Sequence, residues 1–112
     1  MTQPTLSGTR RYRRIFLPTG MFVAWYGGGA QSIGRVKTLG MGGLFLADAS
    51  PPPVNTRLRL SFEVPGGSVH AEAIVRSVTP GEGMGLEFLK TGARERILLE
   101  RLLRRLLQEI PE

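Results

Sequence analysis

Residues 57–76 read RLRLSFEVPGGSVHAEAIVR, and their alternating hydropathy decides the fold class. Apolar and polar residues alternate along 57–64, as in a strand that buries one face and leaves the other in water. Pro65-Gly66-Gly67-Ser68 provides a turn, and the alternation resumes along 69–76. The residues expected to face inward are Leu58, Leu60, Phe62, Val64, Val69, Ala71, Ala73 and Val75. The segment therefore predicts an antiparallel hairpin with one face in a hydrophobic core.

Four further strands are expected outside this hairpin, at 21–26, 33–39, 44–46 and 84–89. Residues 21–26 are apolar throughout, so their inner face cannot be assigned from the pattern. Gly27-Gly28-Gly29 begins a hairpin, prolines at 51–53 exclude a helix or central strand there, and Asn55 suits a left-handed turn. Six short strands with glycine-rich turns favour a small antiparallel β-barrel, because closure removes exposed sheet edges.

The period changes from two to about 3.6 residues after Lys90, which predicts a C-terminal α-helix at about 93–110. Its apolar stripe comprises Leu99, Leu102, Leu103, Leu106, Leu107 and Ile110. Thr91 is the candidate N-cap. The stripe is expected to pack on the barrel, and a homodimer or partner-helix seam is the alternative. We expect a single domain over 10–110, with its barrel at about 15–90 and a flexible tail at 1–9.

The composition limits the classes of function. Fifteen Lys and Arg residues against nine Asp and Glu give a net charge of +6, which favours anionic partners. There is no cysteine and one histidine, His70, so disulfides and thiolate metal sites are excluded and a zinc site is disfavoured. No carboxylate has a visible nucleophile or histidine partner, so no enzyme and no cofactor are expected. No apolar run approaches a signal peptide or a membrane span, and a cytoplasmic protein is expected.

Two segments carry recognition chemistry. The first, Arg10-Arg11-Tyr12-Arg13-Arg14, places two guanidiniums four residues apart, at Arg10 and Arg14. Guanidiniums bind phosphates bidentately and stack on flat bases. The second is the glycine turn 38–44, TLGMGGL, where a main chain without side chains can approach a ligand closely. Together they indicate a receptor for a small anionic nucleotide.

With these segments in this order, the chain resembles the PilZ domain family over about residues 10–89. The resemblance rests on an Arg-x-x-x-Arg pair before the first strand, here Arg10 and Arg14. It also rests on the loop pattern Asp/Asn-x-Ser-x-x-Gly, here 38–43, and on the closing glycine-rich strand 83–88, GMGLEF. It implies a six-stranded antiparallel barrel that binds the bacterial second messenger cyclic di-GMP without enzymatic activity.

The resemblance also implies the roles of the site residues. Arg10 and Arg14 would bind phosphate and guanine, and Thr38, Gly40 and Gly43 would form a platform for a guanine. Ligand capture would be relayed by a conformational change to a protein partner.

The sequence departs from the family pattern at two positions, since Thr38 replaces Asp or Asn and Gly40 replaces Ser. A hydroxyl cannot accept both guanine N1–H and N2–H as a carboxylate does, and the serine hydroxyl is lost. The two departures are expected to weaken affinity by roughly one to two orders of magnitude.

Two alternatives remain open at this point. A degenerate member of the same fold would not bind the nucleotide and would act through protein contacts in motility, pilus or surface-adhesion signalling. A nucleic-acid-binding barrel is disfavoured, because no aromatic and basic residues interleave along one strand.

Overall fold

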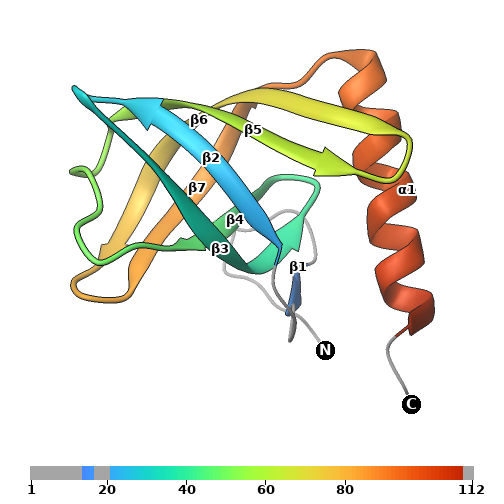
Figure 1. The fold of residues 1–112 in the computed structure, drawn as a ribbon, viewed down its shortest axis with the longest axis horizontal. Coiled ribbons are helices and arrows are strands. Elements are labelled where there is room, and N and C mark those ends of the chain that lie inside the picture. The colour runs from blue at the N-terminus through green and yellow to red at the C-terminus, as the bar shows by residue number, and fades with distance from the viewer. Residues whose placement is uncertain (1–13, 17–20, 110–112) are drawn as a thin grey trace, which may run out of the picture.

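The hairpin expected at 57–76 is present as two long paired strands. The computed structural model describes residues 14–16 and 21–109 (Figure 1). Its elements are β1 (Arg14–Phe16), β2 (Phe22–Gly27), β3 (Ala30–Gly40), β4 (Gly43–Ala47), β5 (Arg57–Val64), β6 (Gly67–Thr79), β7 (Gly83–Lys90) and α1 (Ala93–Glu109). β5 and β6 pair in antiparallel register from Arg57 opposite Ile74 to Val64 opposite Gly67.

The strands close into a barrel, which confirms the predicted fold class. The strand order is β1-β3-β2-β5-β6-β7-β4, and β3 also pairs with β4. β2 pairs with the first half of β3 and β1 with its last residues, 38–40. Six antiparallel strands, β2 to β7, therefore form the closed barrel, and β1 is a short addition where β3 ends.

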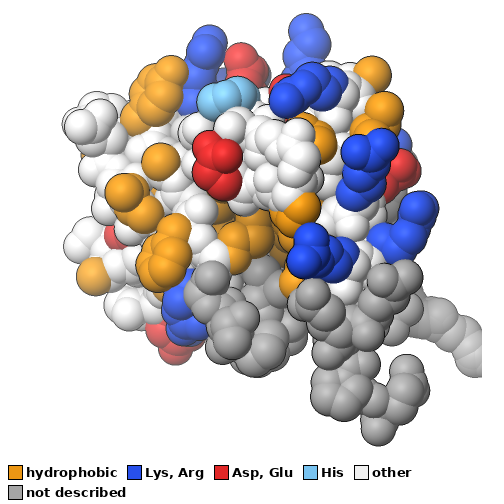
Figure 2. Space-filling model, turned by 45° about the vertical axis from the view of Figure 1, so that its right-hand side comes forward, with side chains coloured by type: hydrophobic (Ala, Val, Ile, Leu, Met, Phe, Trp, Pro, Cys, Tyr) orange, Lys and Arg blue, Asp and Glu red, His pale blue; other side chains and the backbone are white. Residues whose placement is uncertain are grey.

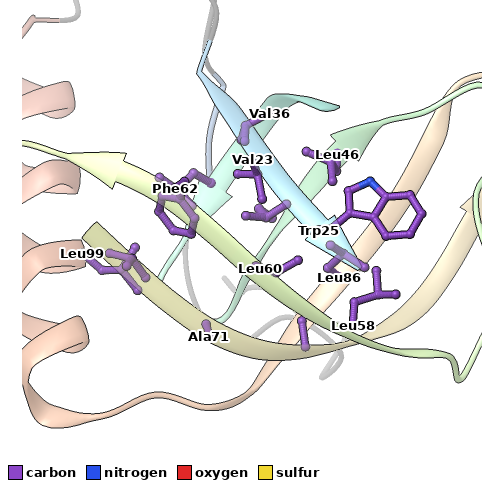
Figure 3. Packing of buried hydrophobic residues seen from close by; sticks show 14 of the residues in the cluster. Val23, Trp25, Val36, Leu46, Leu58, Leu60, Phe62, Ala71, Leu86 and Leu99 are labelled. Carbon is purple, nitrogen blue, oxygen red and sulfur yellow. The ribbon is translucent and has the colours of Figure 1, made fainter. Parts of the chain in front are cut away.

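The inward residues follow the predicted alternation and form one core (Figure 3). On β2, Val23 and Trp25 are buried while Phe22 and Tyr26 point outward. The pattern could not separate these two faces, because the outward face is also apolar. Trp25 is the single tryptophan of the sequence and is 4% exposed, so its fluorescence reports on barrel folding.

Glycines shape the hairpin turns. Gly28 and Gly29, between β2 and β3, have φ of 63° and 80°. These values match a type I′ turn, which needs positive φ at both central residues and suits the twist of a hairpin. The expected hairpin at Gly27-Gly28-Gly29 is thus confirmed.

Asn55 occupies the left-handed region, with φ of 78°, as predicted. Its N–H donates to the Val75 carbonyl at 2.7 Å, so the strained residue is tied to β6. Asn55→Ala is expected to lower the free energy of unfolding by about 1 kcal/mol, whereas Asn55→Gly leaves it nearly unchanged. Urea unfolding followed by Trp25 fluorescence measures both. An equal loss in the two variants would show that a side-chain contact, and not backbone strain, decides this position.

The C-terminal helix covers one side of the barrel, where α1 contacts β6, β5 and β1 (Figure 1). The buried stripe is Leu98, Leu99, Leu102 and Leu103, with Leu106 packed against it. Leu107, expected in the stripe, is 45% exposed, and Ile110 lies outside the described residues. The Gly92 carbonyl accepts the first helical bond, from the Arg96 N–H at 2.9 Å, so Gly92 holds the N-cap position assigned to Thr91.

Candidate functional site

The end of the arginine segment lies beside the start of the glycine turn. β1 pairs with β3 so that Arg14 is opposite Gly40 and Phe16 is opposite Thr38. Arg14 was expected just before the first strand, and it is instead the first residue of β1. The backbone of Arg14 is therefore fixed within one strand spacing of Gly40, about 5 Å.

Thr38 lies on the outer surface of the barrel between two strands. It pairs with Phe16 of β1 on one edge and with Phe45 of β4 on the other. Leu39 and Gly40 are buried, whereas Thr38 is half-buried. Gly40 adds no side chain beside Arg14, its partner on β1.

A β-bulge precedes Thr38 in β3. Val36 pairs with Leu46, and Thr38 pairs with Phe45, so Lys37 is an extra residue opposite the partner strand. Bulges change the direction of side chains and are frequent next to binding sites. Lys37, a half-buried cation directly before Thr38, is not identified by the sequence motif.

Gly43 has a structural reason to be glycine. A Cβ placed at Gly43 would overlap the carbonyl oxygen of Leu86 and lie 3.0 Å from the Glu87 Cα. The Phe88 N–H also donates to the Gly42 carbonyl at 2.9 Å, so the turn is held against β7. The close approach expected at Gly43 is thus made by a neighbouring strand, and a ligand role for Gly43 stays a prediction.

An ion pair lies one strand away from the glycine turn. Glu87 is the β7 partner of Gly43, and its Oε1 lies 2.5 Å from the Nε of Arg76 on β6. Both side chains are half exposed. Arg76 thereby offsets the negative charge of Glu87 at this surface.

The structure thus brings together the backbones of Arg14, Thr38, Gly40 and Gly43, and Arg10 lies outside the described residues. The Arg76–Glu87 pair was missed because it depends on the register of β6 and β7. Across the described segments, no cluster of three or more His, Asp or Glu residues could hold a metal ion. No helix in residues 14–16 and 21–109 is long and apolar enough to cross a membrane.

Comparisons with known proteins agree with this arrangement. The family model described as PilZ domain matches residues 8–105. Among curated proteins, no sequence matches this chain.

Solved structures share the fold at low sequence identity. Escherichia coli YcgR in complex with cyclic di-GMP has a TM-score of 0.73 and 21% identity, covering 90% of this chain and 47% of that one. The Bacillus subtilis inhibitor of motility MotI/DgrA has a TM-score of 0.72 and 21% identity, covering 94% and 55%. Borreliella burgdorferi PlzA in complex with cyclic di-GMP has a TM-score of 0.67 and 18% identity, covering 83% and 40%. This chain therefore spans about half the length of the three proteins.

Proposed function

Because this chain belongs to the PilZ domain family, we propose that it is a non-enzymatic receptor for cyclic di-GMP in bacterial signalling. The observation that carries this proposal is the pairing of β1 with the end of β3, which sets Arg14 opposite Gly40. Support also comes from YcgR and PlzA, two proteins of similar fold whose structures contain cyclic di-GMP.

The residues of the site match the chemistry of the ligand. Cyclic di-GMP carries two phosphates, which guanidinium groups of Arg10 and Arg14 bind as bidentate pairs. Guanine also offers the O6 and N7 acceptors to arginine. Thr38 would contribute one hydroxyl and, with Gly40 and Gly43, form the platform for a guanine, where Gly43 acts by letting the turn close against β7.

The fold offers a route for the relay. β1 contacts α1 as well as pairing with β3. A ligand that draws the arginine segment onto the barrel changes the position of a strand that the helix touches, and α1 then presents a different surface to a protein partner. We place this receptor in the cytoplasm, where the second messenger is available.

Isothermal titration calorimetry of the chain with cyclic di-GMP tests the proposal. Saturable heat is expected, with the affinity reduced by the Thr38 and Gly40 departures. An absence of heat at high micromolar ligand would refute nucleotide binding. It would favour the alternative of a degenerate PilZ domain that acts through protein contacts, whose capture of a partner would be indifferent to added nucleotide.

Thr38→Asp is expected to tighten cyclic di-GMP binding by about tenfold, because a carboxylate accepts two charge-assisted bonds from one guanine edge. Thr38→Val keeps the shape of the side chain, removes the hydroxyl and is expected to weaken binding. The same calorimetry measures both variants, with thermal unfolding as the check on folding. Unchanged affinity in both would show that Thr38 does not contact the ligand.

A further inference from the structure

A second surface, separate from the glycine turn, carries exposed apolar side chains. Phe22 and Tyr26 on β2 and Ile33 on β3 are 61%, 54% and 68% exposed. Ile33 is opposite Ala24, midway between Phe22 and Tyr26 along the neighbouring strand. Large apolar groups gathered in this way on a soluble surface mark an interaction site. We call the outer surface of β2, of β5, of residues 31–35 of β3, of residues 68–74 of β6 and of Lys90 at the end of β7 the aromatic face.

Each aromatic ring of this face has an arginine beside it on the next strand. Phe22 is the partner of Arg35 on β3, and Tyr26 is the partner of Arg59 on β5. Residues paired in this way have Cβ atoms about 5 Å apart, so the guanidinium can reach the neighbouring aromatic ring. Aromatic and basic residues therefore interleave across strands, although they do not interleave along any one strand.

A hollow of about 380 Å³ opens next to Tyr26 on the same face. Its polar lining consists of Arg59, Ser61, His70, Glu72 and Lys90. Figure 2 shows His70, the pale blue residue, on an exposed side that also carries hydrophobic and basic side chains. A hollow with the Tyr26 ring and two cations, Arg59 and Lys90, suits a flat base joined to a phosphate.

Basic groups outnumber acidic ones on this face. The charged residues are Arg35, Arg57, Arg59, Lys90, Glu63 and Glu72. Glu72 Oε2 lies 3.8 Å from Nη2 of Arg59, and Glu63 Oε2 accepts a bond from Ser68 Oγ at 2.8 Å. Both carboxylates thus have partners within the sheet, and the surplus of positive charge faces solvent.

We propose that the aromatic face binds single-stranded nucleic acid, with bases stacked on Phe22 and Tyr26 and phosphates held by Arg35, Arg59 and Lys90. A single strand fits better than a duplex, because the rings need base faces that a duplex keeps stacked. Charge complementarity selects this occupant over an apolar protein surface, since both rings adjoin a guanidinium.

The experiment is fluorescence anisotropy of the full chain with a labelled oligothymidylate, and with oligouridylate, of about 12 nucleotides. Binding is expected at low salt. Three phosphate contacts predict that log affinity falls against log salt with a slope of about −2. Tyr26→Leu, which keeps an apolar side chain and removes the ring, is expected to weaken binding by about tenfold, and Tyr26→Phe to leave it unchanged.

A matched pair of charge variants separates this face from the general basicity of the chain. Arg59→Ala is expected to reduce the salt slope by about 0.7, while Arg101→Ala, an exposed arginine of α1, leaves affinity and slope unchanged. Arg14→Ala is expected to keep oligonucleotide binding. A failure of the nucleic-acid proposal can therefore be distinguished from a failure of the cyclic di-GMP proposal. Tyr26 and Arg59 are more than half exposed, and an unchanged unfolding midpoint verifies that the variants fold.

Three outcomes would overturn the proposal. One is the absence of an anisotropy change at low salt, which would show that the aromatic face does not bind single-stranded nucleic acid. Another is equal weakening by Arg59→Ala and Arg101→Ala, which would show unspecific attraction to a basic protein. The third is full binding by Tyr26→Leu, which would exclude stacking.

Discussion

Gly43→Ala is expected to lower the free energy of unfolding by about 3 kcal/mol or more. The added methyl group would overlap the Leu86 carbonyl oxygen and press on the Glu87 Cα. Both atoms belong to the backbone of β7, so no rotamer change can make room. Gly43 pairs with Glu87 at the first rung of the β4–β7 ladder, and this ladder helps to close the barrel. The strain would therefore act on closure of the whole sheet.

Gly92→Ala provides the matched control, because it adds the same methyl group at the start of α1. There the nearest atom is a carboxylate oxygen of the flexible Glu95 side chain, at 2.7 Å, and neither glycine has a positive φ. A loss of about 1 kcal/mol or less is expected, as for a change at an N-cap. Urea unfolding monitored by Trp25 fluorescence compares the two. Gly43→Ala could instead keep wild-type stability and lose only ligand binding. The packing explanation would then be wrong, and the ligand, not β7, would be what requires a glycine at this position.

The parts of the fold in which apolar and polar residues alternate regularly along the chain could be predicted from the sequence. The alternation along 57–76 requires one face in water and one in the core, and the structure buries the expected set from Leu58 to Val75 except Val64, which is half-buried. Helical periodicity after Lys90 likewise predicted α1 to within about one residue. Residues 21–26 lacked this alternation, because the outward Phe22 and Tyr26 are as apolar as the buried Val23 and Trp25. Their exposure follows only from closure of the barrel.

The parts that depend on register could not be predicted in this way. The strand β1 consists of Arg14, Ile15 and Phe16, too short for any period, and it forms because β3 offers a free edge there. The bulge at Lys37 and the Arg76–Glu87 pair arise from pairing between distant segments. For the site, the motif could name Arg14, Thr38, Gly40 and Gly43, while only the sheet shows how near their backbones lie and why Gly43 is needed for packing.

Arg14→Ala is expected to weaken cyclic di-GMP binding by at least about 100-fold, which calorimetry would register as a loss of saturable heat. A guanidinium that makes two charge-assisted bonds to a phosphate contributes about 1.5–3 kcal/mol through each, and about 1.4 kcal/mol corresponds to tenfold in affinity. The substitution should leave the fold intact, because Arg14 joins β3 through backbone groups that alanine retains. The loss can then be assigned to the side chain.

Two further variants test whether binding depends on the planar guanidinium group of Arg14. Arg14→Lys keeps the charge but not the planar pair of donors, so its affinity is expected to lie between those of the wild type and Arg14→Ala. Arg101→Ala removes the same charge from the exposed surface of α1 and is expected to bind like the wild type. Wild-type affinity in Arg14→Ala would mean that the pairing of β1 with the glycine turn serves the barrel alone. Equal losses in Arg14→Ala and Arg101→Ala would attribute binding to net charge and not to a site at Gly40.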